Sequence, residues 1–252
     1  MSAARVFVVD IETSPNAGFT WAKYDQTVIE PLWGWQLLSF AYKELGRGKA
    51  KCIARPDFKD KTDASLVKAV WKILNEADVI IAHNGDRFDL PKLRAKFVAH
   101  GLAPIRPVKT IDTKKVAKAN FGFYSNSLND IARDLGLGEK VKTGGFDLWK
   151  RCMSGYSLPG PIDHPAWNKM RRYNTYDVIL LEKVYQRLKS WHPSHPNLAL
   201  YGGEGDKPEC PICESTKVQR RGYHVMKVRR AARYHCQRCG HWFSRALKRS
   251  ES

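Results

Sequence analysis

The stretch RVFVVDIETSP, residues 5–15, decides the fold and raises the question of function. Its first half, Val6 to Val9, is apolar, β-branched and aromatic, which predicts a buried strand. Asp10 and Glu12 then stand where such a strand would still be apolar. Because successive side chains of a strand point to opposite faces, the two carboxylates lie on one face. Two like charges so close together cost free energy unless a cation lies between them. We therefore expect a cation at this strand end.

The segments that follow alternate between strand-like and helix-like patterns, which favours an α/β fold. Further strands are expected within residues 36–45, 50–56, 78–85 and 108–112. Helices are expected within residues 63–77, 88–101, 112–118, 127–138 and 165–191. Asp63 stands where it could cap the first of these helices. The chain therefore predicts a sheet covered by helices.

The chain of 252 residues carries a formal net charge of +18, which indicates a polyanionic partner. That partner is either nucleic acid or an anionic membrane surface. No apolar stretch approaches the roughly 18–20 residues that cross a bilayer, and the first residues lack the features of a signal peptide. We expect an intracellular, cytoplasmic protein that binds DNA or RNA and has no membrane partner.

A boundary is predicted near residue 194, where prolines and glycines replace the periodic pattern. We expect one large domain over residues 1–193, a linker over 194–207 and a small basic module over 208–252. From residue 196 onward, twelve Lys or Arg residues stand against five Asp or Glu residues, a net charge of +7. The charge density is therefore highest in this tail.

Two more carboxylates lie where a helix meets the expected core. Asp177 lies on the apolar stripe of the helix within 165–191, and Tyr173 lies one turn before it on the same face. Asp89 follows an apolar strand at the start of a helix. Each has an ordinary explanation on its own, namely a salt bridge for Asp177 and a role at the helix N-terminus for Asp89.

Taken together, these residues form three motifs that resemble those of the DEDDy 3′–5′ exonucleases of the proofreading type. VVDIETSP resembles the first motif, HNGDRFDLPKL the second and YNTYD the third, in the order of that family. The resemblance covers about residues 4–190. The related DEDDh branch has a His where this chain has Arg172, so Tyr173 places the chain in the DEDDy branch.

This resemblance implies an RNase H-like fold, in which helices flank a mixed five-stranded sheet, and a site for two Mg²⁺ or Mn²⁺ ions. Asp10, Glu12 and Asp177 would hold the ion next to the attacking water. Asp10 would also bridge to the second ion, which Asp89 helps to fix. The resemblance further implies that Tyr173 orients or deprotonates the water. Residues implied to contact the substrate in this domain are Thr13 and Asn84.

Aromatic residues after the first motif allow two interpretations. Trp33 and Trp35 could stack on bases, whereas an aromatic pair that enters a strand is more often part of the core. We assign at least one of the two to the core.

Four cysteines near the C-terminus form two Cys-x-x-Cys pairs, Cys210 with Cys213 and Cys236 with Cys239. This spacing is typical of a tetrahedral structural Zn²⁺ site, and the segment resembles a zinc ribbon. A redox dithiol is the alternative, for which no thioredoxin-like context exists. Basic residues between the pairs predict contacts with nucleic acid: Arg220, Arg221, Arg229 and Arg230.

These observations predict a metal-dependent 3′–5′ exonuclease, with DNA as the favoured substrate, single strands preferred and RNA as the alternative. The zinc ribbon would help to hold the substrate, and replication or repair proteins are the expected protein partners. One rival is an endonuclease or a ribonuclease on the same fold. The other is a nucleic-acid-binding adaptor without activity, against which the intact set of four acids and one Tyr argues.

Overall fold

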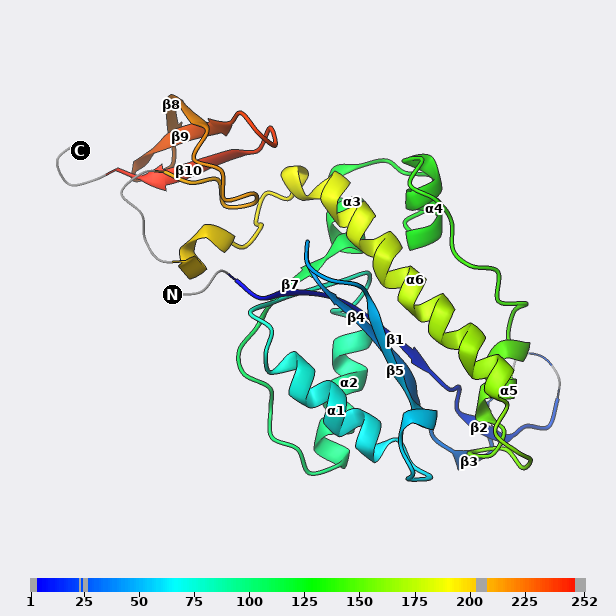
Figure 1. The fold of residues 1–252 in the computed structure, drawn as a ribbon. Coiled ribbons are helices and arrows are strands. Elements are labelled where there is room, and N and C mark those ends of the chain that lie inside the picture. The colour runs from blue at the N-terminus through cyan, green and yellow to red at the C-terminus, as the bar shows by residue number, and fades with distance from the viewer. Residues whose placement is uncertain (1–3, 23, 25–26, 203–207, 248–252) are drawn as a thin grey trace.

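The computed structural model describes residues 4–22, 24, 27–202 and 208–247. Its centre is a five-stranded sheet (Figure 1), whose strands follow the order β5-β4-β1-β6-β7. The strands are β1 Val6–Thr13, β4 Leu37–Glu44, β5 Lys51–Ala54, β6 Val79–Ala82 and β7 Lys109–Asp112. β4 runs antiparallel to β1 and to β5, whereas β6 runs parallel to β1 and to β7. The predicted mixed five-stranded sheet is therefore confirmed.

Helices cover both faces of this sheet (Figure 1). One face packs against α1 Ala64–Leu74 and α2 Asp89–Ala99. The other face packs against α3 Thr113–Asn120, α4 Leu128–Asp134 and the long helix α6 His164–Leu188. A short helix, α5 Asp147–Met153, packs against the first half of α6, and the 3₁₀ turn η1 Arg55–Asp57 follows β5. None of the described helices is long and apolar enough to cross a membrane.

The alternation along β1 explains which face carries its acids. Phe7 and Val9 belong to the core beneath α1 and α2, whereas Val6 and Val8 belong to the core beneath α6. Side chains two residues apart share a face. Asp10 and Glu12 therefore point to the α6 side of the sheet, with Ile11 buried on the opposite side.

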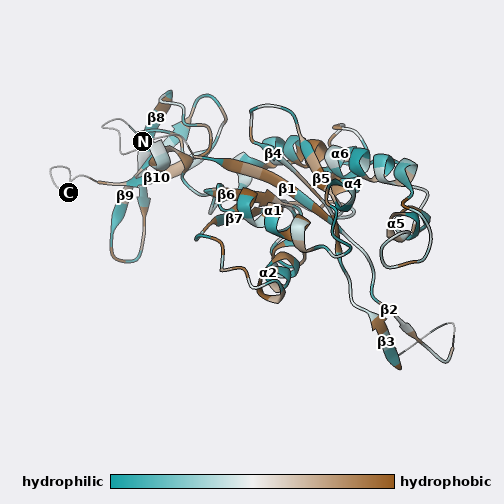
Figure 2. Ribbon diagram, turned by 60° about the horizontal axis from the view of Figure 1, so that its bottom comes forward, coloured by the Kyte–Doolittle hydropathy of each residue, from teal (hydrophilic) through white to brown (hydrophobic). Residues whose placement is uncertain are grey.

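A hairpin arm projects from the body between β1 and β4 and was not predicted (Figure 2). It consists of the antiparallel strands β2 Ala17–Phe19 and β3 Glu30–Trp33. Gly18 permits their close approach, because a Cβ there would lie 2.4 Å from Val28 Cγ1 and 2.8 Å from the carbonyl oxygen of Glu30. Phe19 and Trp21 on this arm are 56% and 92% exposed.

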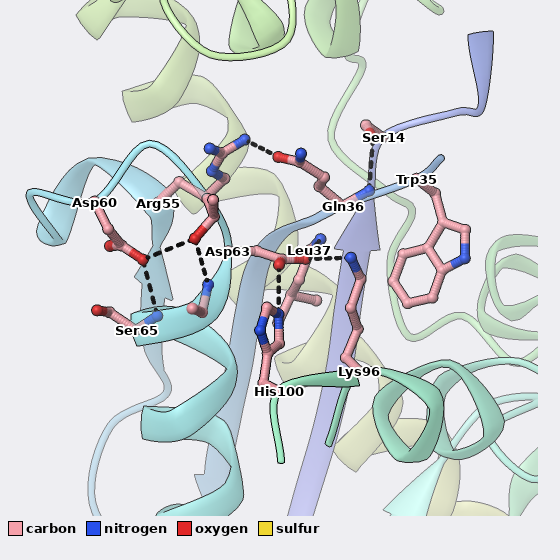
Figure 3. A network of polar contacts seen from close by, with 12 residues as sticks. Ser14, Trp35, Gln36, Leu37, Arg55, Asp60, Asp63, Ser65, Lys96 and His100 are labelled. Carbon is pink, nitrogen blue, oxygen red and sulfur yellow. Dashed lines mark hydrogen bonds and ion pairs between the residues drawn. The ribbon is translucent and has the colours of Figure 1, made fainter. Parts of the chain in front are cut away.

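A network of polar contacts fixes the foot of the arm to the body (Figure 3). The backbone N–H of Ser14 donates to the carbonyl oxygen of Gln36, and Ser14 Oγ accepts from the N–H of Gln36. The buried guanidinium of Arg55 donates to Gln36 Oε1 at 2.6 Å. These contacts set the position at which the chain returns from the arm into β4.

The contacts of Asp63, in the same network, correct the expectation that its side chain caps α1. It occupies the N-cap position of α1, but its side chain makes no capping hydrogen bond. Its carboxylate instead accepts from the N–H of Leu37 at 2.8 Å and pairs with Lys96 at 2.8 Å and His100 at 2.9 Å (Figure 3). The physical reason is that a buried carboxylate gains more from a Lys and a His than from one backbone N–H. Asp63 thus ties α1, α2 and β4 together.

The C-terminal module is a three-stranded sheet in the order β10-β9-β8. Its strands are β8 Val218–Val225, β9 Arg230–Cys236 and β10 Trp242–Ala246. It contacts the 3₁₀ turn that continues α6, η2 Lys189–Trp191, where Ser190 Oγ donates to the carbonyl oxygen of Cys239 at 2.9 Å. His241 Nδ1 lies 2.9 Å from the carbonyl oxygen of Ser190.

The expected linker contains the 3₁₀ turn η3 Leu198–Gly202, and Leu198 is buried in the main core. Residues 203–207 of that linker lie outside the described residues.

Candidate active site

Three carboxylates from two distant parts of the chain meet at the end of β1. Asp10, Glu12 and Asp177 each offer an oxygen, and these oxygens all lie within 4.8 Å of one another. Asp177 comes from the buried stripe of α6, which crosses the sheet face that carries the two strand residues. The alternation of β1 and the helical period of α6 thus produce one acidic cluster.

Asp89 approaches the same strand from the other side. It is the first residue of α2 and only 4% exposed, and its Oδ1 accepts from the N–H of Ile11 at 3.2 Å. Its charge raises the pKa of Asp10, so the two carboxylates are electrostatic neighbours. Asp89 is not among the three residues that meet within 4.8 Å.

The electrostatics of the cluster call for a cation. Burial raises the pKa of Asp10 well above its ordinary value, and the neighbouring carboxylates raise it further. Burial, and after it the charge of Asp177, raises the pKa of Glu12 to about 8. Burial also raises the pKa of Asp89 to about 7. The groups of the protein alone therefore compensate the negative charge of these carboxylates poorly.

One oxygen of the Asp177 carboxylate marks where the negative charge of the cluster is not compensated. Asp177 is fully buried, and its Oδ1 has no hydrogen-bond partner among the residues that the structure describes. A buried, unpaired carboxylate oxygen beside two further carboxylates fits a hard divalent cation such as Mg²⁺ or Mn²⁺, which prefers oxygen ligands. The donor set therefore fits the metal that the sequence motifs imply.

Lys140 supplies the nearby positive charge, and sequence analysis did not find it. Its Nζ lies 2.6 Å from Asp177 Oδ2 and donates to the hydroxyl of Tyr173 at 3.1 Å. Burial alone would lower the pKa of Lys140, but the charges of Asp177, Tyr173 and Asp10 and the hydrogen bond to Asp177 together outweigh it, so the pKa is raised. Lys140 lies in the loop between α4 and α5, where no periodic pattern could mark it.

Tyr173 lies one turn before Asp177, as the sequence spacing requires. The residue is 9% exposed, and its ring packs edge-on against Trp149 with centroids 5.8 Å apart. Burial, followed by the charge of Asp177, raises the pKa of the Tyr173 hydroxyl. The hydroxyl is therefore neutral and can act as a hydrogen-bond donor or acceptor near the carboxylates.

Two further side chains orient the strand carboxylates, and neither was predicted. Asn174 Nδ2 donates to Asp10 Oδ2 at 2.6 Å, and Asn174 Oδ1 accepts from Ser39 Oγ at 2.9 Å. Trp149 Nε1 donates to Glu12 Oε2 at 3.1 Å. In the sequence, only the position of Asn174 next to Tyr173 on α6 could have indicated its role, because the residues that it contacts, Asp10 and Ser39, lie far away in the chain.

The two residues of the large domain that are expected to contact the substrate lie at the ends of strands. Thr13 ends β1 and is half-buried, directly after Glu12. Asn84 follows β6 with φ +67°, and its N–H donates to Asp112 Oδ1 at 2.9 Å. A non-glycine residue with positive φ is strained and is common near functional sites.

The four cysteines of the C-terminal module also converge. Their sulfur atoms all lie within 4.8 Å of one another, and none forms a disulfide. Cys210 Sγ lies 3.6 Å from Cys239 Sγ, and Cys213 Sγ lies 3.6 Å from Cys236 Sγ. Four such sulfur atoms fit a tetrahedral Zn²⁺ site. The four arginines predicted to bind nucleic acid are exposed on or beside β8 and β9: Arg220, Arg221, Arg229 and Arg230.

Comparison with known proteins places the fold. A family model of the RNase H superfamily matches residues 37–189. Among solved structures, the family B DNA polymerase from the hyperthermophilic archaeon Pyrobaculum calidifontis is similar, with a TM-score of 0.54 at 16% identity. The match covers 75% of this chain and 25% of the polymerase chain, so the likeness concerns the fold. No curated protein matches this sequence. Because the family model spans more than half of the chain, the protein belongs to the RNase H superfamily.

Proposed function

We propose that this protein is a metal-dependent 3′–5′ exonuclease that hydrolyses the terminal phosphodiester of a DNA strand, with single strands preferred. The observation that carries the proposal is the convergence of Asp10, Glu12 and Asp177, where a buried Asp177 oxygen has no hydrogen-bond partner within the described part of the chain. Membership of the RNase H superfamily and the likeness to a DNA polymerase fold support a nuclease. The resemblance to the DEDDy motifs supports the direction of cleavage.

In this proposal Asp10, Glu12 and Asp177 would hold one divalent ion, and Asp10 and Asp89 would help to hold a second. Such ions would stabilise the charge on the attacking and leaving oxygens and lower the pKa of a bound water. Asn174 and Trp149 keep the strand carboxylates in position through the hydrogen bonds described above. These contacts fix the ligands before the substrate arrives.

Lys140 and Tyr173 act on the substrate side of this site in our proposal. The ammonium of Lys140 lies within hydrogen-bonding distance of both Asp177 and the Tyr173 hydroxyl. A cation there can stabilise negative charge that develops on the phosphoryl group. Lys140 also holds the hydroxyl of Tyr173 in a fixed place, from which it can orient the attacking water.

We also propose that the two domains have different roles. Residues 1–193 would cleave the strand, and residues 208–252 would bind zinc and help to bind the strand. The first domain carries the carboxylate cluster of Asp10, Glu12 and Asp177. The second carries exposed arginines and a four-cysteine cluster. A closed tetrahedral site has no open position, so its role is structural.

The test uses a 5′-labelled single strand, a labelled duplex and a labelled RNA, each with Mg²⁺, Mn²⁺ or EDTA. A ladder that shortens by single nucleotides from the 3′ end, only with metal, supports the proposal. Discrete internal cuts would favour an endonuclease, preference for RNA a ribonuclease, and binding without cleavage an adaptor. Asp10→Ala should abolish cleavage and leave binding intact. Asp134→Ala, an exposed acid on α4, is the matched control and should retain full activity.

A further inference from the structure

The β2–β3 arm carries an apolar face with one acid on it. Phe19 lies directly opposite Glu30 across the hairpin, and Leu32 lies two residues further along β3. Opposed residues of a strand pair share a face, as do residues two apart along a strand, so these three side chains form one surface, the arm face. Phe19 is 56% and Leu32 49% exposed, and the exposed Glu30 forms no ion pair with any described residue. Exposed apolar side chains on a projecting two-stranded hairpin indicate a partner that covers them.

A groove of about 410 Å³ lies along the C-terminal half of α2. The loop that follows α2 forms its second wall and is held in place by two hydrogen bonds. The N–H of Leu102 donates to the carbonyl oxygen of Phe97 at 2.8 Å, and the indole of Trp71 donates to that of Ala103 at 2.7 Å. Apolar side chains form most of the lining: Phe97, Val98, Leu102, Ile105 and Val108. Since Val98 is 78% exposed, the groove is open to a partner.

Two arginines line this groove, and they differ in their contacts. Arg106 donates to Asp78 at 2.6 Å and to the carbonyl oxygens of Glu76 and Ala77. Arg94 is exposed, and its guanidinium forms no ion pair within the described part of the chain. None of the residues that line the groove is acidic. The groove therefore combines apolar surface with one uncompensated positive charge.

The arm face and the groove complement each other in polarity and charge. The arm face has two apolar side chains beside a carboxylate, and the groove has apolar walls beside the guanidinium of Arg94. Nucleic acid fits the arm poorly, because phosphates require basic residues and neither β2 nor β3 contains one. Residues 14–36 contain one lysine and two acids, although the whole chain has a net charge of +18. The arm is therefore suited to a basic, apolar protein surface, and this chain itself carries one.

The arm is held away from the groove of its own chain. Hydrogen bonds among Ser14, Gln36 and Arg55 fix its foot, and Lys92 near the start of α2 lies 4.0 Å from the ring of Trp35 at that foot. From there the arm projects away from the body (Figure 2), whereas the groove lies further along α2, against the body. An arm and a groove therefore meet only between two copies.

We propose that two copies of this chain pair by exchange of their arms, so that the arm face of each copy lies in the groove of the other with Glu30 against Arg94. Because each copy gives one arm and receives one, a single two-fold axis satisfies both contacts and closes the pair. The groove lies on the α1–α2 side of the sheet, and the acidic cluster faces α6. The pairing therefore leaves the carboxylates uncovered, and it does not depend on the proposed function.

The test is charge reversal followed by mixing, with the mass measured by analytical ultracentrifugation. Wild type should be a monomer at about 1 µM and a dimer at about 100 µM, because a small interface binds weakly. Glu30→Arg and Arg94→Glu should each weaken the dimer at least about 10-fold, since like charges then meet at both contacts. An equimolar mixture of the two variants should dimerise as wild type does. In the mixed pair the reversed arm meets the reversed groove, and the other arm and groove are both native.

Matched controls reverse charges elsewhere and remove apolar contacts. Glu139→Arg and Arg133→Glu change exposed charges on or after α4 and should leave the dimer unchanged, alone and mixed. Leu32→Ser and Val98→Ser should weaken the dimer, and mixing them should not restore it, because one contact of the mixed pair stays defective. Melting temperatures equal to that of wild type show that each variant folds.

Three outcomes would overturn this inference. Wild type could stay monomeric at every concentration, or the charge reversals could leave its dimer intact, which would mean that the pair forms through another surface. The third is that the two reversed variants, each folded and monomeric, fail to dimerise when mixed. Ultracentrifugation reports mass and not cleavage, so each outcome is independent of the nuclease assay.

Discussion

The side-chain amide of Asn174 donates to Asp10 Oδ2 at 2.6 Å, across 164 positions of the sequence. Asn174 is fully buried, and its Oδ1 accepts from Ser39 Oγ. This contact joins the strand that carries two of the acids to the helix that carries the third. An amide is suited to this place because it donates to Asp10 while it accepts from Ser39. A carboxylate of the same shape could only accept at neutral pH.

We therefore expect Asn174→Asp to disable the site. The substitution brings another negative charge against Asp10 in a buried cluster that already lacks compensation. Activity should fall about 10- to 100-fold, in line with loss of groups that position catalytic ligands. The melting temperature without metal should fall as well. Steady-state kinetics and calorimetry measure the two effects.

The matched control is Gln186→Glu, which makes the same amide-to-acid change at an exposed position of α6. It should leave both quantities unchanged. Wild-type activity in Asn174→Asp would show that the contact with Asp10 is incidental to catalysis.

The contacts of the Lys140 ammonium lead to a second prediction. Its ammonium contacts both Asp177 and Tyr173, so Lys140→Met removes the positive charge while keeping most of the side-chain volume. We expect kcat at saturating strand to fall about 100-fold, the usual effect of losing one group that stabilises transition-state charge. Lys140→Arg keeps the charge and should lose less. A single-turnover rate within about threefold of wild type for Lys140→Met would remove Lys140 from the mechanism.

The sheet could be predicted because its signals are local. The apolar runs of β1, β4 and β6 and the stripe of α6 are periodic, and Gly and Pro mark many of the boundaries. The arm could not be predicted, since residues 14–36 mix aromatic, polar and glycine residues without a period. Its shape depends on the close approach at Gly18 and on the contacts between Ser14 and Gln36.

The same distinction applies to the site. Asp10, Glu12 and Asp177 stand out in the sequence because a charge on a buried strand or helix stripe needs an explanation. Lys140 lies in a loop, and Trp149 looks like an ordinary aromatic residue of a short helix. Their roles arise only from tertiary contacts with Asp177 and Glu12. Partners that meet only in the folded chain leave no periodic trace in sequence.

The raised pKa of Glu12 predicts how the metal-free protein responds to pH. A free Glu side chain has a pKa of about 4.3, whereas that of Glu12 is raised to about 8 by burial and by Asp177. Between these values the folded state holds a proton that the unfolded state has released. The free energy of unfolding should therefore decrease as the pH rises from about 4.5 to about 8.

Glu12→Gln cannot titrate, so in EDTA at pH 8 it should melt at least about 2 °C above wild type. At pH 4.5 the two should melt together. With saturating Mg²⁺ at pH 8, wild type should instead melt above Glu12→Gln, because only wild type keeps the Glu12 carboxylate as a metal ligand. The exposed acid variant Glu139→Gln should follow wild type throughout. Parallel curves for Glu12→Gln and wild type in EDTA would contradict the raised pKa.

The exposed arginines of the C-terminal module make the last prediction. If Arg221 and Arg229 contact phosphates, replacing both with Ala should reduce the salt dependence of single-strand binding by about 1.4 in the slope of log K against log salt, since each contact contributes about 0.7. Affinity should fall for every sequence alike, because phosphate contacts carry no sequence information. Binding is measured in EDTA by fluorescence anisotropy at several salt concentrations. Lys68→Ala with Lys72→Ala removes two exposed charges from α1 and should leave the slope unchanged. Equal slopes for the arginine variant and wild type would show that the strand does not reach β8 and β9.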